Sequence, residues 1–214
     1  MKTKPKVLGL VMAAVLLVTA TIFGTMAYLT STDEVVNTFT VGSVAIKLDE
    51  AKANTDGSLV DGADRVQANS YKLIPGHTYA KDPMVTVLNN SEASYVRMTV
   101  TFSNSAELAA IFDGEANMLE IFNGYDSTNW LYKGNVEDDS ANTCTYEFWY
   151  KEAVSAADGD AALDALFDSI TVPGEITNEQ LATINDMTIT VNAYAIQADG
   201  FDTADAAWAA FPAN

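Results

Sequence analysis

A chain of 214 residues that is 49% hydrophobic can enclose one sizeable core, because the buried fraction of the surface rises with chain length. Its 29 acidic and 11 basic residues give a formal net charge of −18, and such a surface repels nucleic acid phosphates and anionic lipids. The composition therefore predicts one domain, argues against nucleic acid as a partner, and limits membrane contact to the N-terminal segment.

The N-terminus has the three parts of a secretory signal peptide. Lysines lead into an uncharged apolar run that ends at Gly24, and small residues follow at Thr25 and Ala27. A basic start, an apolar centre and small residues at the −3 and −1 positions are typical of exported proteins. We therefore expect residues 1–27 to be a signal helix that is cleaved between Ala27 and Tyr28. The alternative is an uncleaved anchor, since roughly 18 apolar residues approach the length that spans a bilayer.

Residues 28–40 form a segment between the signal peptide and a domain predicted at 41–214. The second half of this segment is rich in β-branched and apolar residues whose side chains alternate between two faces, and this pattern favours an extended conformation. The residues that we single out as a strand able to pair with a sheet are Val35, Val36, Asn37, Thr38 and Phe39. Whether or not the signal peptide is cleaved, we expect the segment and the domain to lie outside the cytoplasm, in the extracellular matrix or at the cell surface.

Two-residue periodicity predicts that most of the domain is β-structure. The clearest case is 95–102, where Val96, Met98, Val100 and Phe102 alternate with the residues between them. This alternation is expected of an antiparallel sheet that has one face on the core. Further strands are expected at 44–48, 81–88, 143–150 and 187–196. Between the first two, the polar stretch at 49–70 is interpreted as a long loop or an irregular hairpin.

A hairpin is predicted around the only cysteine of the chain. Trp130 and Tyr132 precede an acidic turn at 134–142, and the strand at 143–150 follows it. Since Cys144 would lie on an apolar face of that strand, we interpret it as a small buried hydrophobic residue. A single cysteine also excludes an intramolecular disulfide.

Short helices are expected between the strands, where the apolar spacing changes to three and four residues. They are predicted at 105–112, at 160–168, at 178–185 and after Thr203. The first is expected to have Asn104 or Ser105 as its N-cap. The third is expected to begin with a capping box formed by Thr177 and Gln180, and the last to have Thr203 as its N-cap. Strands joined by short turns, with helices inserted between some of them, predict a mostly β fold: an antiparallel β-sandwich with short helical insertions.

Few residues could carry out chemistry. The chain has one histidine, His77, in a Pro-Gly turn, whereas a zinc protease of known type needs two histidines on one helical face and a general-base glutamate. The loop that contains Asp56, Asp61 and Asp64 could offer oxygen ligands to calcium, but it lacks the residue order of an EF-hand. We therefore predict no catalytic, cofactor-binding or metal-binding residues and no enzymatic activity, with calcium as the one cofactor left open.

Three stretches taken together resemble TasA/camelysin-type secreted proteins. The first is the stretch 24–30, where small residues end the apolar run of the signal peptide, followed by Asn-Thr-Phe-Thr-Val-Gly at 37–42. The second is the Pro-Gly turn at 73–82 with the strand and Asn-Asn-Ser that follow it. The third is the last strand with its continuation at 195–201 and the tryptophan-containing helix after it. The helical insertions expected around Leu108, Leu163 and Leu181 depart from the family's pattern.

The resemblance implies a jelly-roll-like sandwich, processing by a dedicated SipW-type signal peptidase, and assembly into extracellular biofilm matrix fibres, with an accessory matrix protein as a further partner. In that family the N-terminal segment of one subunit adds a strand to the sheet of the next, and 28–40 matches this donor strand here. The leading hypothesis is thus a secreted structural subunit that forms a homopolymer. The alternatives are a camelysin-like surface metalloprotease and a monomeric surface binding module, and 35–41 could also be the first strand of its own sheet.

Overall fold

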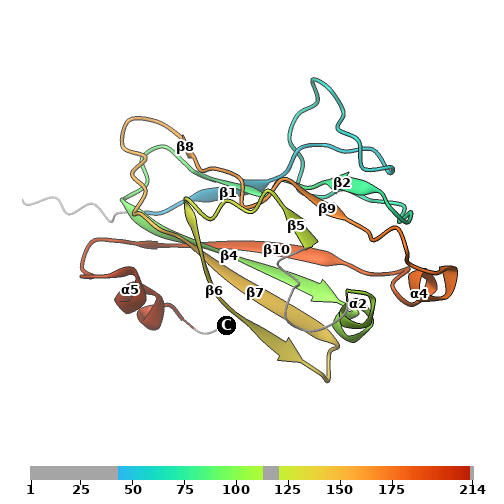
Figure 1. Ribbon diagram of the computed structural model, residues 1–214. Helices are drawn as coiled ribbons and strands as arrows, with labels where there is room; N and C mark the ends of the chain where they lie inside the picture. The colour runs from blue at the N-terminus through green and yellow to red at the C-terminus, as the bar shows by residue number, and fades with distance from the viewer. Residues whose placement is uncertain (1–42, 113–120, 213–214) are drawn as a thin grey trace, which may run out of the picture. The chain divides into compact units, whose positions relative to one another are not determined.

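The computed structural model describes residues 43–112 and 121–212, and the predicted signal peptide and donor segment lie outside these residues. The described part is mostly β, with three antiparallel sheets and a few short helices (Figure 1). This arrangement is consistent with the predicted β-sandwich. None of its helices has the length and apolarity needed to cross a membrane.

The largest sheet has four strands in the order β10-β4-β7-β6. Their bounds are β10 (Ile189–Gln197), β4 (Ser94–Ser103), β7 (Thr143–Tyr150) and β6 (Trp130–Asp138). The predicted alternation of β4 is confirmed, since every second residue of the strand is buried. Val96, Met98 and Val100 are 0% exposed, so this face of β4 lies on the core and the other face lies outside.

The other two sheets have three strands each, in the orders β1-β3-β8 and β2-β9-β5. Their bounds are β1 (Ile46–Asp49), β3 (Met84–Val87), β8 (Ala161–Ala162), β2 (Thr78–Ala80), β9 (Ser169–Thr171) and β5 (Phe122–Asn123). In Figure 1 both sheets lie above the four-stranded sheet. Aromatic residues pack between the layers: Phe122 of β5 contacts Phe102 of β4 and Phe148 of β7, with ring centroids 5.6 and 6.2 Å apart.

Three short helices, α2 (Ser105–Ile111), α4 (Asn178–Thr183) and α5 (Ala204–Ala210), follow strands or loops. The predicted capping box of α4 is confirmed, and the side chain of Thr203 caps α5 as expected. The predicted cap of α2 is confirmed in position only. Asn104 occupies the N-cap position in a left-handed conformation (φ 56°) without a capping hydrogen bond, and the Asn142 side chain accepts one from Ala106 N–H instead (3.0 Å).

The helix predicted at 160–168 is not formed. This stretch contains the two-residue strand β8, and its backbone bonds to neighbouring strands: Leu163 N–H donates to Val85 and Leu166 N–H to Pro83. The apolar spacing that predicted a helix instead belongs to buried side chains of an extended segment, with Leu166 and Phe167 at 0% exposure. A lesser correction concerns β6, which continues through Asp138 and shortens the predicted turn. The stretch at 49–70 is an irregular hairpin with two isolated bridges, one of the two alternatives expected for it.

Candidate functional site

The two outer strands of the four-stranded sheet differ in how they are protected. β6 carries Lys133, Glu137 and Asp138, and its register shifts at a bulge between Tyr132 and Gly134. Charges and bulges on an outer strand are features that prevent pairing with another chain. β10 has no charged residue, proline or glycine, and it pairs with β4 over nine residues without a shift. Within the described chain, β10 therefore presents an edge suited to the addition of a strand.

Hydrogen bonds at the two ends of β10 show which of its backbone groups bond to β4 and which point to the open edge. Ser103 N–H donates to the Thr188 carbonyl (3.0 Å), and Ala198 N–H donates to the Ala93 carbonyl (2.7 Å). Because bonded and non-bonded positions alternate in an antiparallel pair, the even-numbered residues of β10 bond to β4. The residues whose N–H and C=O groups point to the open edge are Ile189, Val191, Ala193, Ala195 and, at the end of the strand, Gln197. The first four of these are apolar.

The side chains at these same positions are incompletely covered. Ile189, Val191, Ala193 and Ala195 share the inner face with Phe102, Val100, Met98 and Val96 of β4. The β4 residues are at most 1% exposed, whereas the β10 residues are only partly buried. The inner face is thus shielded as far as β4 and remains partly open along β10.

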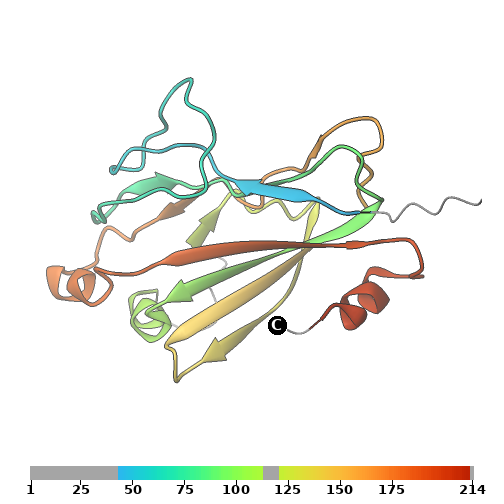
Figure 2. The ribbon, with the colours of Figure 1, turned by 180° about the vertical axis from the view of Figure 1, so that it is seen from behind.

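A groove follows this open edge. A cavity of about 700 Å³ lies between β1 and β10, with apolar walls formed by Ile46, Leu48, Ile189 and Val191. A second cavity of about 360 Å³ continues past Ile189 and is lined by side chains that include Met187, Tyr79 and Val172. Figure 2 shows β1 and β10 running beside each other on this side of the molecule. We call the two cavities together the β10 groove.

A buried ion pair marks the junction of the two cavities. Lys81 and Asn69 line both of them. The Lys81 ammonium lies 2.6 Å from a Glu50 carboxylate oxygen, and the two side chains are 9% and 7% exposed. Asn69 donates to the other Glu50 oxygen (3.0 Å). The groove therefore combines apolar side chains of β1 and β10 with polar ones, and the Lys81–Glu50 pair lies where its two cavities meet.

A second set of charges fixes the neighbouring backbone. Arg65 lies 2.5 Å from the Asp49 carboxylate and 2.8 Å from that of Asp82, and the Asp82 carboxylate accepts a hydrogen bond from Ala51 N–H (2.6 Å). Burial raises the pKa of Asp49, but hydrogen bonds and charges from Lys47 and Arg65 outweigh it and hold the pKa below its ordinary value. These contacts connect the end of β1, on one side of the groove, to the loop before β3.

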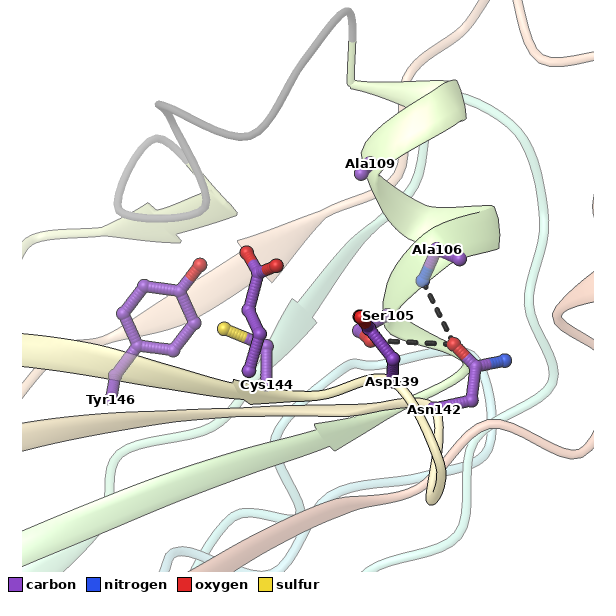
Figure 3. Close-up of a pocket in the computed structure, with 8 residues that line it drawn as sticks. Ser105, Ala106, Ala109, Asp139, Asn142, Cys144 and Tyr146 are labelled. Carbon is purple, nitrogen blue, oxygen red and sulfur yellow. Dashed lines mark hydrogen bonds between the residues drawn. The ribbon is translucent and has the colours of Figure 1, made fainter.

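A further cavity, of about 530 Å³, lies between α2 and the β6–β7 hairpin (Figure 3). Glu137, Asp139, Cys144 and Tyr146 line it. Burial, followed by the nearby Cys144, raises the pKa of the Tyr146 hydroxyl, so this group stays protonated at neutral pH. The Cys144 thiol has Asn135 as its neighbour (3.5 Å). The only imidazole of the chain, that of His77, lies in a different turn, so this cavity has no histidine beside the thiol.

The structure locates some of the predicted site residues and not others. His77 is exposed in its turn, and Asp56 accepts hydrogen bonds from the backbone and hydroxyl of Ser58 (3.0 and 2.7 Å). Between residues 43 and 212, leaving aside 113–120, no three His, Cys, Asp or Glu side chains come together in a group that could hold a metal ion. The cleavage site and all the candidate donor-strand residues lie outside the described ranges.

Sequence reasoning missed the β10 groove because β1 and β10 are far apart in the chain. One local signal was available: β10 is nine residues long without a charge, proline or glycine, which is uncommon for an outer strand. The position of Lys81 and Glu50 in the core was not visible in the pattern.

Comparisons with models of protein families, with curated proteins and with solved structures found no match to this chain.

Proposed function

We propose that this protein is a secreted, non-catalytic structural subunit that polymerises into extracellular matrix fibres. Its N-terminal segment at 28–40, released by cleavage after Ala27, would add a strand along β10 of the next subunit. The observation that carries the proposal is the open, uncharged edge of β10 beside a groove with apolar walls. The jelly-roll topology, the signal peptidase and an accessory matrix protein belong to the same proposal through the family resemblance.

Strand addition suits both partners physically. The outward N–H and C=O groups of β10 would bond to the backbone of the added strand, which supplies affinity largely independent of sequence. Alternate side chains of that strand would enter the groove and supply specificity. The face that contains Val35, Asn37 and Phe39 offers large apolar groups at this spacing, and each buried Val or Phe stabilises the contact by about 1.5–3 kcal/mol.

Cleavage after Ala27 would remove Lys2, Lys4 and Lys6 and leave 8 basic and 29 acidic residues, and this formal net charge of −21 makes association sensitive to salt. Subunits with this charge repel one another, and dissolved ions reduce the repulsion over about 10 Å at 0.1 M. The added segment around 35–39 is itself uncharged, so it can approach the groove without adding to the repulsion. We therefore expect fibre growth to be faster at moderate ionic strength.

Deleting 28–40 from the mature protein tests the proposal. The truncated chain keeps the whole described domain, so its thermal unfolding should match that of the full mature chain, while electron microscopy should show no fibres. Fibres of normal length from the truncated protein would refute strand donation. A casein-cleavage assay with and without a chelator serves as the test of the metalloprotease alternative, and turnover that a chelator abolishes would refute the non-catalytic assignment.

A further inference from the structure

The ammonium group of Lys81 has unused hydrogen-bonding capacity. A lysine ammonium carries three donors, and in the described chain only the Glu50 carboxylate accepts from it. The Lys81 side chain is 9% exposed and lines both cavities of the β10 groove. Two of its donors are therefore free for an occupant of the groove that brings an acceptor to this position.

The neighbouring groups restrict the chemistry of that acceptor. Glu50 lies against Lys81, and its carboxylate can accept more than the two bonds from Lys81 and Asn69. A carboxylate ligand would meet the Glu50 charge and be repelled. A carboxamide satisfies both groups, because its oxygen accepts from the ammonium and its NH₂ donates to the carboxylate. The Lys81–Glu50 pair is therefore complementary to an asparagine or glutamine side chain.

We propose that the side chain of Asn37 from a neighbouring subunit binds the Lys81–Glu50 pair and sets the register of the added strand, an inference that rests on the proposed function. Asn37 is the only polar residue on the face formed by Val35, Asn37 and Phe39. Residues two apart in a strand are separated by about 6.6–6.8 Å on the same face. With Asn37 at the junction of the cavities, Val35 and Phe39 occupy the apolar cavities on either side.

The position of the segment in the chain supports it as the occupant. Residues 1–42 lie outside the described structure and end immediately before Ser43, which leads into β1 at one wall of the groove. The register that follows places Asn37 opposite Ile189, the β10 residue that lines both cavities.

Disulfide trapping on the outer face of the sheet tests this register without altering the groove. If Asn37 faces Ile189, its neighbours Val36 and Thr38 face Thr188 and Thr190, which are exposed residues of the outer face. Mature protein with Thr38→Cys is mixed with separate proteins that carry Thr188→Cys, Thr190→Cys or Asn192→Cys, and is oxidised during polymerisation. The expected intermolecular disulfide forms with position 188 or 190. Val36→Cys then bonds to the other of these two positions.

The outcomes separate the register from the function. Fibres that crosslink mainly through position 192 overturn the register and leave strand donation standing. Fibres that crosslink at none of the three positions overturn both proposals. The last outcome concerns a double variant that carries Thr38→Cys together with Thr188→Cys or Thr190→Cys. If this protein stays monomeric and forms only an internal disulfide, the segment inserts into its own subunit. That result also overturns both proposals.

Substitution of Asn37 tests the recognition chemistry on a residue outside the folded domain. Asn37→Leu should slow fibre growth about tenfold or more, since it removes the bonds that Asn37 would make to Lys81 and Glu50. Asn37→Asp should do the same at neutral pH through repulsion by Glu50. The matched control Thr38→Val, on the opposite face, should polymerise normally. In a Lys81→Met background that still folds, the effect of Asn37→Leu on the rate of fibre growth should be smaller, because only the bond to Glu50 remains to be lost. Normal growth of both Asn37 variants overturns the inference.

Discussion

Replacing Val191 with proline should raise the concentration needed for polymerisation without unfolding the domain. The register places the Val191 N–H on the open side of β10 and not on the side of β4. A proline is tolerated on an outer strand where its missing N–H faces away from the sheet. At this position it removes a donor that an added strand would use, and its ring lies where the backbone of that strand must approach.

The expected magnitude follows from one lost hydrogen bond. Such a bond contributes about 0.5–1.5 kcal/mol net, and the carbonyl of the added strand that loses its donor costs about 1–3 kcal/mol. Because 1.4 kcal/mol corresponds to a tenfold change in affinity, association should weaken about tenfold or more at every junction of the fibre. The free energy of unfolding of the subunit should change by less than about 1 kcal/mol.

A matched variant makes the prediction specific to the open edge. Asn192→Pro removes an N–H that bonds to Thr99 of β4, so it should destabilise the domain by about 1–3 kcal/mol. Val191→Ala controls for the lost side chain. Light scattering over a concentration series measures polymerisation, and thermal or denaturant unfolding measures stability. If Val191→Pro polymerises like the unmodified protein, or unfolds as readily as Asn192→Pro, the assignment of β10 as the accepting edge is wrong.

Three further predictions concern the domain that presents this edge. Phe167→Ala should reduce the free energy of unfolding by about 3–5 kcal/mol in denaturant titrations, because it empties a fully buried site stacked on Phe122; a cost below about 1 kcal/mol would contradict the packing. Asn142→Ala should cost about 0.5–2 kcal/mol by removing the cap of α2, with a local loss of hydrogen-exchange protection there. Arg65→Met should cost about 1–3 kcal/mol at pH 7. Since the pKa of Asp49 is depressed below its ordinary value of 3.8, its stabilising contribution is present above that pH and is lost as pH falls through the folded-state pKa. The difference in stability between the unmodified protein and the Arg65→Met variant should therefore shrink in acid, and a difference that stays constant down to about pH 2 would refute this ion pair.

The strands with strong alternation could be predicted from the sequence because their pattern is local. In β4 and β10 each residue's face follows from its own position, and the sheet preserves that pattern. The capping box at Thr177 and the cap at Thr203 are equally local, since the groups that bond lie three residues apart.

The errors arose where distant residues decide the outcome. The spacing of Leu163, Leu166 and Phe167 fits a helix, yet hydrogen bonds to Pro83 and Val85 hold this stretch extended beside β3. The cap of α2 comes from Asn142, 36 residues beyond the N–H that it accepts from. Neither partner can be identified from the segment that it controls.

Of the two parts of the candidate site, the donor segment could be predicted from the sequence and the accepting groove could not. The segment at 28–40, uncharged from Val35 onward, could be proposed as a donor because the family resemblance implies that role and its composition favours an extended strand after the predicted cleavage site. The accepting groove combines β1, β10 and the Lys81–Glu50 pair, which tertiary packing brings together from distant parts of the chain. Its existence became visible only when the hydrogen-bonded order of the strands was known.

Mixing two complementary variants tests the central claim most directly. Mature protein that lacks 28–40 keeps the accepting edge but has no donor, and the Val191→Pro protein keeps the donor but has a blocked edge. Neither should polymerise alone, and each should elute as a monomer. Mixed together, they should form a complex of one donor and one acceptor that does not grow further, as measured by size-exclusion chromatography with light scattering. If the mixture remains monomeric at concentrations where the unmodified mature protein forms fibres, the segment at 28–40 does not join subunits through β10.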